Sequence, residues 1–278
     1  MQGDSMKNTV KVALVMALGA LLIMAAGCTK AESAQTTPTT GSGPLAGQTL
    51  VVATDAPYPP MEMVKSDGSF EGFDVDIMTT AAKNAGANVE FKTSGFDALI
   101  AAMGATGGDF DCAISSITIT DERKDNMLFS DPYFNANQSM AVPTDSALAS
   151  TDDLVKGNKV AVQLGTTGEI WANKNLKPKG IEIKSYDQIP GCFGALSAGD
   201  VDAVIADFQV TSDYAKDETR KAKIVQQIET GEQYGIAFPK GSEAEVAAIN
   251  DGIKKLKEDG TYAKLYKTWF GVEPETIP

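Results

Sequence analysis

The stretch that decides the fold is Cys112-Ala113-Ile114-Ser115-Ser116-Ile117-Thr118-Ile119-Thr120-Asp121-Glu122-Arg123. It opens with apolar and β-branched residues, which are typical of a buried strand in a parallel sheet. Hydroxyl side chains follow, Thr120 is a candidate helix N-cap, and two acidic residues come next, in the first turn of the predicted helix. Hydroxyls, helix-start amides and the guanidinium of Arg123 at the carboxyl end of a strand favour the capture of a small carboxylate. Ligand binding is therefore the leading hypothesis, ahead of catalysis.

Strand-like and helix-like segments alternate along the rest of the chain. We predict strands at 49–54, 89–91, 159–162 and 201–206, helices at 73–85 and 96–103, and a further helix from Glu169. This alternation predicts an α/β protein with parallel sheets.

The N-terminal residues 1–28 are predicted to be an export signal. Lys7 and Lys11 supply a positive start, and the uncharged apolar run 12–26 has 15 residues, fewer than the ~20 that a membrane-spanning helix needs. Small residues before Cys28 resemble a bacterial lipobox, in which the cysteine is lipidated. An ordinary signal peptide with a chance cysteine is the alternative. Residues 29–47, rich in Thr, Ser, Ala, Gly and Pro, are predicted to be a disordered tether.

Composition excludes several classes of function. The formal net charge of −13 argues against nucleic acid or anionic lipid as a binding partner. The chain has no histidine, which rules out histidine-dependent triads, imidazole zinc sites and histidine acid–base catalysis. Cys112 and Cys192 lie far apart in apolar or glycine-rich surroundings, which predicts two buried thiols and no disulfide. We expect neither a metal nor a cofactor.

Polar side chains follow the predicted strands at the point where each strand ends. In parallel sheets, ligands bind outside the carboxyl ends of the strands. The polar residues at these ends are Asp55, Ser115, Ser116, Thr118, Gln163, Thr166, Thr167 and Asp207. Plain alternatives exist: Asp55 and Asp207 could be turn formers after strands, and Arg123 could pair with a neighbouring aspartate on the surface. Two nearby aromatics, Tyr58 and Phe96, could simply be core residues, and the stretch 165–168 could be a tight connection. The recurrence of polar residues at successive strand ends favours a binding site.

An α-amino acid has the charge pattern that this set would complement. Arg123, with the amides near Thr118 and Thr167, suits the carboxylate of such a ligand, and Asp207 suits its ammonium group. Aromatic rings at Tyr58 and Phe96 suit its side chain, through apolar contact or cation–π attraction.

Ordered motifs extend over nearly the whole segment from Leu50 to Gly271. They are Ala53-Thr54-Asp55, Tyr58-Pro59-Pro60, Gly72-Phe73-Asp74-Val75-Asp76, Gly95-Phe96-Asp97-Ala98-Leu99-Ile100, Ile117-Thr118-Ile119-Thr120-Asp121-Glu122-Arg123, Phe129-Ser130-Asp131-Pro132-Tyr133, Gln163-Leu164-Gly165-Thr166-Thr167, Val201-Asp202-Ala203-Val204, Tyr234-Gly235-Ile236-Ala237-Phe238-Pro239-Lys240-Gly241, Asp259-Gly260-Thr261-Tyr262 and Lys267-Thr268-Trp269-Phe270-Gly271. With these motifs the chain resembles the extracytoplasmic solute-binding proteins of polar amino-acid ABC importers, of the glutamine-, arginine-, lysine- or histidine-binding type.

This resemblance implies a two-lobed periplasmic-binding-protein fold of the α/β class. Each lobe would be a mostly parallel sheet flanked by helices, and a double-stranded hinge would cross near 135–139 and 233–237. Lobe one would comprise 48–137 plus 235–278, and lobe two 138–234. The implied protein is a monomer outside the cytoplasm, lipid-anchored at the cell membrane or in the periplasm, that delivers its ligand to an importer permease.

The resemblance also implies a role for each residue that contacts the α-groups of the ligand. Arg123, assisted by Thr118 and Thr167, would hold the α-carboxylate. Asp207, with the backbone of Ser116 and with Thr118, would hold the α-ammonium.

The ligand side chain would be flanked by Tyr58 and Phe96, with Asp55, Ser115 and Gln163 at its far end. Asp55 would repel a carboxylate side chain, which disfavours glutamate and aspartate. Gln163 stands where some glutamine-binding relatives carry lysine, so a positive charge is missing there. This pattern favours arginine or lysine as the ligand, with glutamine and histidine as open alternatives.

Two other functions are possible on the same scaffold. One is an enzyme that resembles the periplasmic cyclohexadienyl or arogenate dehydratases, for which Asp55 is the candidate acid. The other is a subunit that presents its ligand to a separate sensor. The intact amino-acid-binding set favours transport, so we expect no enzyme activity.

Overall fold

The computed structural model describes residues 42–105 and 107–278. The predicted export signal, Cys28 and residues 29–41 of the predicted tether lie outside the described residues. Residues 42–47, which the sequence places in the tether, pack against the folded part of the chain. Leu45 is 3% exposed, and its N–H donates to the carbonyl of Ala85 at 3.0 Å. The packed part of the chain therefore begins before residue 48.

The first of two five-stranded sheets has the strand order β4-β1-β5-β12-β6. Its strands are β4 (Asn88–Thr93), β1 (Thr49–Thr54), β5 (Cys112–Ala113), β12 (Ala237–Phe238) and β6 (Leu128–Phe129). The pairs β1–β4 and β1–β5 are parallel, and β12 pairs antiparallel with both β5 and β6. Hence β12 alone runs against the other strands of this sheet.

The second sheet repeats this arrangement, with the order β11-β7-β10-β8-β9. Its strands are β11 (Ala222–Tyr234), β7 (Phe134–Pro143), β10 (Ala203–Asp207), β8 (Lys159–Gln163) and β9 (Glu182–Tyr186). β8 is parallel to β9 and β10, and β7 is antiparallel to β10 and β11. The expected mostly parallel α/β sheets are confirmed. A small ribbon, β2 (Met63–Val64) with β3 (Phe70–Glu71), completes the strands.

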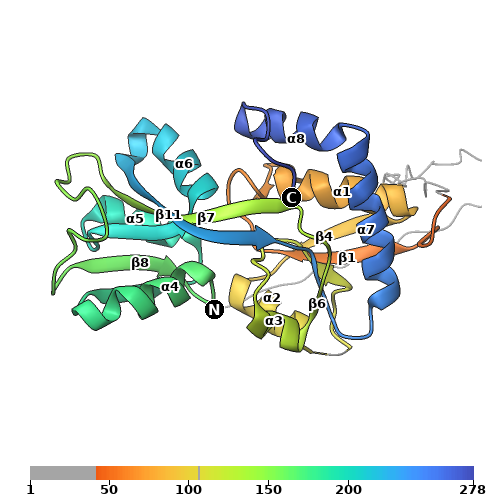
Figure 1. The fold of residues 1–278 in the computed structure, drawn as a ribbon, viewed down its shortest axis with the longest axis horizontal. Coiled ribbons are helices and arrows are strands. Elements are labelled where there is room, and N and C mark those ends of the chain that lie inside the picture. Colours follow the sequence, from red (N-terminus) through yellow and green to blue (C-terminus); the bar gives the residue numbers. More distant parts are fainter. Residues whose placement is uncertain (1–41, 106) are drawn as a thin grey trace, which may run out of the picture. The chain divides into compact units, whose positions relative to one another are not determined.

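Helices flank both sheets (Figure 1). Around the first sheet lie α1 (Phe73–Ala85), α2 (Phe96–Met103), α3 (Asp121–Asn126), α7 (Glu243–Glu258) and α8 (Thr261–Phe270). Around the second lie α4 (Thr167–Asn175), α5 (Ile189–Ala198) and α6 (Phe208–Lys216), with short 3-10 turns at Lys177–Lys179 and Glu218–Arg220.

The segment after Cys112 differs from the expected strand. β5 is only two residues long, and three residues after its end the chain leaves the extended conformation at Ser116, whose φ is 49°. Thr120 is the helix N-cap, as predicted, and its Oγ1 accepts the N–H of Arg123 at 3.2 Å. Helix α4 begins at Thr167, two residues before the predicted start, because Thr166 serves as its N-cap.

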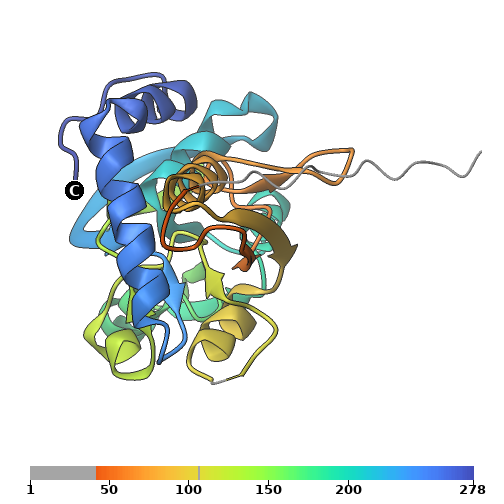
Figure 2. The same ribbon diagram turned by 90° about the vertical axis from the view of Figure 1, so that its right-hand side faces the viewer.

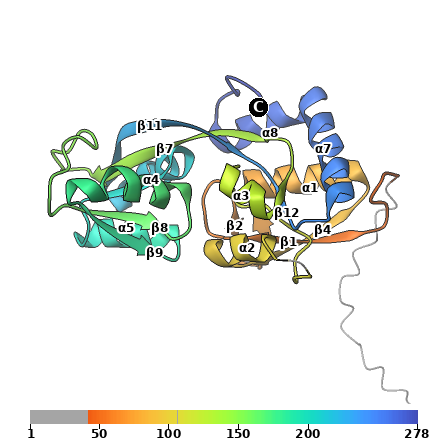
Figure 3. The same ribbon diagram turned by 60° about the horizontal axis from the view of Figure 1, so that its bottom comes forward.

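Two long strands, β7 and β11, connect the sheets (Figure 3). They pair antiparallel, and their register shifts between Ile228 and Glu232. Both crossings that the sequence suggested, 135–139 and 233–237, overlap these two strands. The irregular pairing at the register shift is a place where the ladder can bend.

An aromatic cluster anchors these strands to the first sheet. Phe73 at the start of α1 packs edge-on against Phe134 of β7, with ring centroids 5.5 Å apart. Phe134 stacks on its cross-strand partner Tyr234 at 5.4 Å. Tyr262 and Phe270 of α8 also pack against Phe73, and Phe270 contacts Phe134 as well. The cluster therefore ties the two connecting strands to α1 and α8.

Within the described part of the chain, no helix combines the length and apolar character needed to cross a membrane.

Helix α7 packs closely on α1 (Figure 2), and this contact generates a test of the fold. A Cβ at Gly252 of α7 would lie 2.3 Å from the carbonyl oxygen of Ala81. We expect Gly252→Ala to lower the free energy of unfolding by about 1–3 kcal/mol, because the helices must separate. Gly194→Ala in α5 is the matched control, since a Cβ there meets nothing within 4 Å; it should be neutral or stabilising. Urea unfolding of both variants checks this, and equal effects would contradict it.

Candidate functional site

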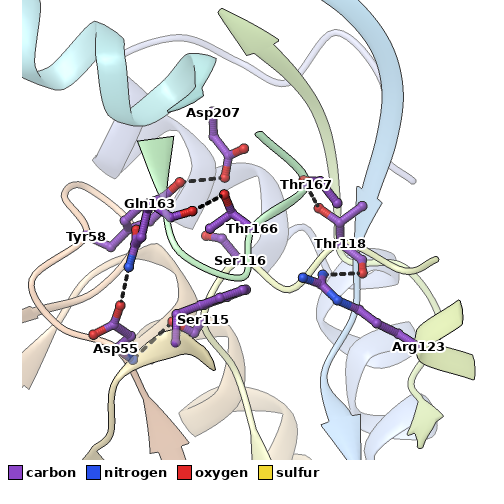
Figure 4. A pocket seen from close by; sticks show the side chains of 11 residues that line it. Asp55, Tyr58, Ser115, Ser116, Thr118, Arg123, Gln163, Thr166, Thr167 and Asp207 are labelled. Carbon is purple, nitrogen blue, oxygen red and sulfur yellow. Dashed lines mark hydrogen bonds between the residues drawn. The ribbon is translucent and has the colours of Figure 1, made fainter. Parts of the chain in front are cut away.

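A pocket with an empty volume of about 300 Å³ lies where the carboxyl ends of strands from the two sheets face each other. All ten residues that the sequence singled out for ligand binding line it, together with Thr166 (Figure 4). The ten are Asp55, Tyr58, Phe96, Ser115, Ser116, Thr118, Arg123, Gln163, Thr167 and Asp207. The structure thus brings the whole predicted set together; what each residue does there remains a prediction.

Asp55, just after β1, accepts hydrogen bonds from two glutamines of the other lobe. Gln163 at the end of β8 donates from Nε2 to Oδ2 at 2.6 Å, and Gln188 donates to Oδ1 at 3.3 Å. The N–H of Asp55 donates to the hydroxyl of Ser115 at 3.0 Å. Burial raises the pKa of Asp55, and the two glutamine hydrogen bonds oppose that rise. A carboxyl group with side-chain amide donors on both oxygens therefore marks this end of the pocket.

Asp207, the last residue of β10, is a second buried carboxyl group, 7% exposed. The hydroxyl of Tyr58 donates to its Oδ2 at 2.8 Å, and Gln138 donates to its Oδ1 at 2.5 Å. Burial, with a smaller contribution from Glu232, raises the pKa of Asp207 to about 6. At neutral pH this group is a carboxylate that lacks a cationic partner among the described residues.

Arg123 is buried, at 7% exposed, and is not a surface ion-pair partner of its acidic neighbours. Its guanidinium donates to the carbonyl of Thr118 at 2.8 Å and, from the other lobe, to the carbonyl of Gly165 at 3.1 Å. Its Cζ lies 5.4 Å from the centroid of the Phe96 ring. Burial lowers the pKa of Arg123 and the charge of Glu232 opposes this, but a guanidinium stays protonated at neutral pH.

Gly165 has a conformation that this contact requires. Its φ is 77°, in the left-handed region, and a Cβ there would lie 3.3 Å from Cβ of Asp97. Glycine therefore allows the turn after β8 to bring its carbonyl to Arg123.

Thr118 and Thr167 approach each other from the two lobes. Their hydroxyl oxygens are 3.3 Å apart, and both hydroxyls donate to the same oxygen, Oε2 of Glu232, at 2.7 Å. Glu232 lies in β11, at the register shift. The hydroxyls of the two threonines next to Arg123 thus already bind a carboxylate oxygen.

Sequence analysis missed three residues of this network: Gln138, Gln188 and Glu232. Gln138 donates to Asp207 and lies within 3.4 Å of both Thr167 and Glu232. The polar run Asn137-Gln138-Ser139, in the predicted hinge crossing 135–139, was the available signal. The sequence holds no such signal for Glu232 and Gln188, because only the pairing of β11 with β7 and the approach of the lobes bring these residues to the site.

Formal charges around the pocket are unbalanced. Asp55, Asp207 and Glu232 contribute three carboxyl groups, whereas Arg123 is the one cationic side chain among the described residues that line it. Within residues 42–105 and 107–278, no cluster of three Cys, Asp or Glu side chains is placed to hold a metal ion. The pocket therefore combines one buried cation with an excess of carboxyl groups.

Comparisons with known proteins agree with this geometry. Residues 50–272 match the family model of the bacterial extracellular solute-binding proteins, family 3. A "Probable histidine-binding protein" of Neisseria gonorrhoeae is 39% identical over 229 residues, which cover 82% of this chain and 85% of that protein.

Solved structures are similar over most of their length. An ancestral arginine-binding protein bound to arginine is 41% identical with a TM-score of 0.75, and the match covers 80% of this chain and 98% of that one. An ancestral arginine-binding protein bound to glutamine gives the same identity and TM-score, over 81% and 98% of the two chains. The ancestral amino acid-binding protein AncCDT-1, a precursor of cyclohexadienyl dehydratase, is 38% identical with a TM-score of 0.74, over 80% and 95%.

The raised pKa of Asp207 predicts that its carboxylate weakens the ligand-free fold. Because the pKa is higher in the folded state, the folded protein loses stability as the pH rises towards about 6. We expect the free energy of unfolding of Asp207→Asn, relative to that of the original protein, to rise by about 1 kcal/mol from about pH 5 to about pH 7.5. Urea unfolding at both pH values checks this. Asp202→Asn, which removes a carboxylate that accepts the N–H of Lys159 on the surface, is the control. A difference that does not change with pH would contradict the prediction.

Proposed function

Because the chain belongs to family 3 of the bacterial extracellular solute-binding proteins, we propose that it binds a polar L-amino acid in this pocket. It then delivers the ligand to an ABC-type importer by closure of its two lobes. The observation that carries the proposal is the pairing of one buried guanidinium, Arg123, with one buried carboxylate, Asp207, in a single pocket.

The α-groups of an amino acid match these two charges. Arg123 would take the α-carboxylate, with the hydroxyls of Thr118 and Thr167 assisting. That both hydroxyls donate to one carboxylate oxygen of Glu232 supports this role, because it is the geometry that a carboxylate requires. Asp207 would hold the α-ammonium, together with the Ser116 backbone and Thr118.

The ligand side chain would lie between Tyr58 and Phe96 and point towards Asp55. We propose a basic amino acid, arginine or lysine, ahead of glutamine. Asp55 is kept in place by amide donors from Gln163 and Gln188, and no cation among the described lining residues other than Arg123 offsets its charge. The excess of carboxyl groups favours a ligand with a net positive charge. The similarity to proteins named for arginine and histidine is consistent with this choice.

Closure would be the step that couples binding to delivery. Lobe one comprises 48–137 plus 235–278 in this proposal and lobe two 138–234, with β7 and β11 as the hinge. Hydrogen bonds from Arg123 to Gly165 and from Gln163 to Asp55 join the two lobes. A ligand that contacts both lobes binds the closed form more tightly and shifts the open–closed equilibrium towards it.

We also propose that the protein acts outside the cytoplasm as a monomer, and that a lipid on Cys28 anchors it to the membrane. The tether would then hold the binding domain near the permease. The family membership supports the extracytoplasmic location.

The dehydratase alternative has one observation in its favour. Burial raises the pKa of Asp55, as an acid catalyst requires, and AncCDT-1 is among the similar structures. Against it, hydrogen bonds from Gln188 and Gln163 oppose that shift and occupy both oxygens of the carboxyl group. Binding without turnover is therefore the better supported function.

The direct test is a thermal-shift screen against the twenty amino acids, after unfolding and refolding to remove any carried-over ligand. A ligand at 100 times its dissociation constant should add about 2.7 kcal/mol to the free energy of unfolding. We expect the largest shift with arginine or lysine. A response to glutamine alone would overturn the choice of ligand but keep the function, and no response to any amino acid would overturn the function.

Arg123→Ala should abolish these shifts, because the carboxylate loses its only cationic partner in the pocket lining. The other arginine of the chain, Arg220, stacks on Tyr214 in lobe two with its Cζ 3.9 Å from the ring centroid. Arg220→Ala is the matched control and should keep them. Unchanged affinity of Arg123→Ala by calorimetry would refute the carboxylate assignment.

Specificity is tested at Asp55. We expect Asp55→Asn to weaken the binding of L-arginine by about tenfold or more and that of L-glutamine by much less, because only the cationic side chain loses a charge partner. Calorimetric titration of both ligands measures the ratio. Equal losses for the two ligands would mean that Asp55 has a structural role.

A further inference from the structure

Two carboxyl groups that are not among the lining residues lie directly behind the pocket. Glu62 immediately precedes β2, Asp74 lies in the first turn of α1, and both are 0% exposed. The backbone brings them together, because the N–H of Asp74 donates at 2.9 Å to the carbonyl of Met61, the residue directly before Glu62. An ionised carboxylate has no proton to donate, so two neighbouring buried carboxyl groups can hydrogen-bond only if one of them carries a proton.

The hydrogen-bond partners indicate where this proton is. Oδ2 of Asp74 accepts the N–H of Ser116 at 2.6 Å and the hydroxyl of Tyr133 at 2.8 Å, which favours an ionised Asp74. Oε1 of Glu62 accepts the hydroxyl of Ser115 at 2.5 Å. The remaining oxygens, Oε2 of Glu62 and Oδ1 of Asp74, are buried and have no hydrogen-bond partner among the described residues. A proton on Oε2 of Glu62, directed at Oδ1 of Asp74, would give both oxygens a partner.

The surroundings of the pair keep the proton in place. Burial raises the pKa of Glu62 well above its usual value, and the charge of Asp74 adds to the effect. Burial also raises the pKa of Asp74, to about 7, against the hydrogen bond from Ser116. The other titratable groups that face the pair are Asp55, Tyr58, Tyr133 and Tyr262. None of these is a cation, so loss of the proton would leave two adjacent, uncompensated carboxylates.

Glu62 and Asp74 hydrogen-bond to two neighbouring residues at one edge of the pocket, Ser115 and Ser116. Ser116 is 4% exposed and has a φ of 49°, which is unfavourable for a residue with a side chain. The hydrogen bond from its N–H to Asp74 keeps it in this conformation. Ser115 is fixed by Glu62, to which its hydroxyl donates, and by Asp55, whose N–H it accepts.

A glycine allows the two carboxyl groups to approach. Gly72 precedes α1 with a φ of 138°, and a Cβ there would lie 2.1 Å from the carbonyl oxygen of Met61. Any side chain at this position would push the start of α1, and Asp74 with it, away from Glu62.

We propose that Glu62 and Asp74 share one proton at neutral pH, and that this proton positions Ser115 and Ser116 for the bound ligand. The positioning of a ligand rests on the proposed function, whereas the shared proton and its hold on Ser116 do not. At alkaline pH the proton leaves, the two buried carboxylates repel each other, and the Ser115–Ser116 edge moves. Ligand affinity then falls.

The variant Glu62→Gln removes the shared proton but keeps the shape and packing of the side chain. The amide has the shape of the protonated carboxyl group, so its carbonyl accepts from Ser115 and its N–H donates to Asp74. Asp74→Asn is the second variant, because its carbonyl accepts from Ser116 and its N–H donates to Glu62. Each variant keeps the hydrogen bonds and has no shared proton to lose. Asp202→Asn is the control for removal of an unrelated carboxylate.

The first measurement needs no ligand. Isotope-labelled serine allows the amide resonances of Ser115 and Ser116 to be followed by NMR from about pH 6 to about pH 10, a range that includes the pKa of about 7 of Asp74 and extends into alkaline pH. We expect both to titrate in the original protein and in Asp202→Asn, and to be unchanged with pH in Glu62→Gln. Amides that do not titrate in the original protein, or that titrate equally in Glu62→Gln, would overturn the proposal. If Glu62→Gln fails to fold, Asp74→Asn and the titration of the original protein decide the question.

The second measurement is the affinity for L-arginine at about pH 7 and about pH 9.5. We expect the dissociation constant of the original protein to rise at least about fivefold more than that of Glu62→Gln. The ratio cancels the titration of the ligand's own ammonium group. Equal rises would overturn the positioning role. If neither protein binds L-arginine, the failure belongs to the proposed ligand, and the NMR titration still decides whether the proton holds Ser116.

Discussion

The organisation of this protein depends on an excess of carboxyl groups around a single buried guanidinium. Asp55, Asp207 and Glu232 surround the pocket, two more lie behind it, and Arg123 is the one cation among the described lining residues. Burying a charge without a partner costs several kcal/mol. The fold therefore has to supply neutral donors to each carboxyl group, and the basic ligand that we propose would supply the missing positive charge.

Neutral donors come from both lobes, so the pocket depends on how the two lobes meet. Amides of Gln138 and Gln163 and the hydroxyls of Tyr58, Thr118 and Thr167 all donate to carboxylates. Most of these hydrogen bonds join residues more than 60 positions apart in the sequence. Parallel strands make this possible, because their carboxyl ends lie at one edge of each sheet. The two edges face each other, and β7 and β11 connect the two sheets.

Stability and binding are opposed at these positions. The raised pKa of Asp207 means that its charge is held at a cost to the ligand-free fold, and the left-handed Ser116 adds backbone strain at the same site. Rigid packing elsewhere offsets this, as in the aromatic cluster around Phe73 and Phe134. A site kept in this state is pre-organised for a ligand that compensates the charge.

Sequence by itself determined the α/β class, the bounds of α1 and α2, the N-cap Thr120 and all ten predicted lining residues. It did so because alternating periodicity and the polar ends of strands are local signals. Only the tertiary structure decided that Gln138, Gln188 and Glu232 join the site, that β5 stops at Ala113, and that Glu62 meets Asp74. These depend on strand pairing across the hinge and on the approach of α1 to the Glu62 turn. Such contacts between distant residues leave no periodic pattern in the chain, because each is set by the packing of whole elements.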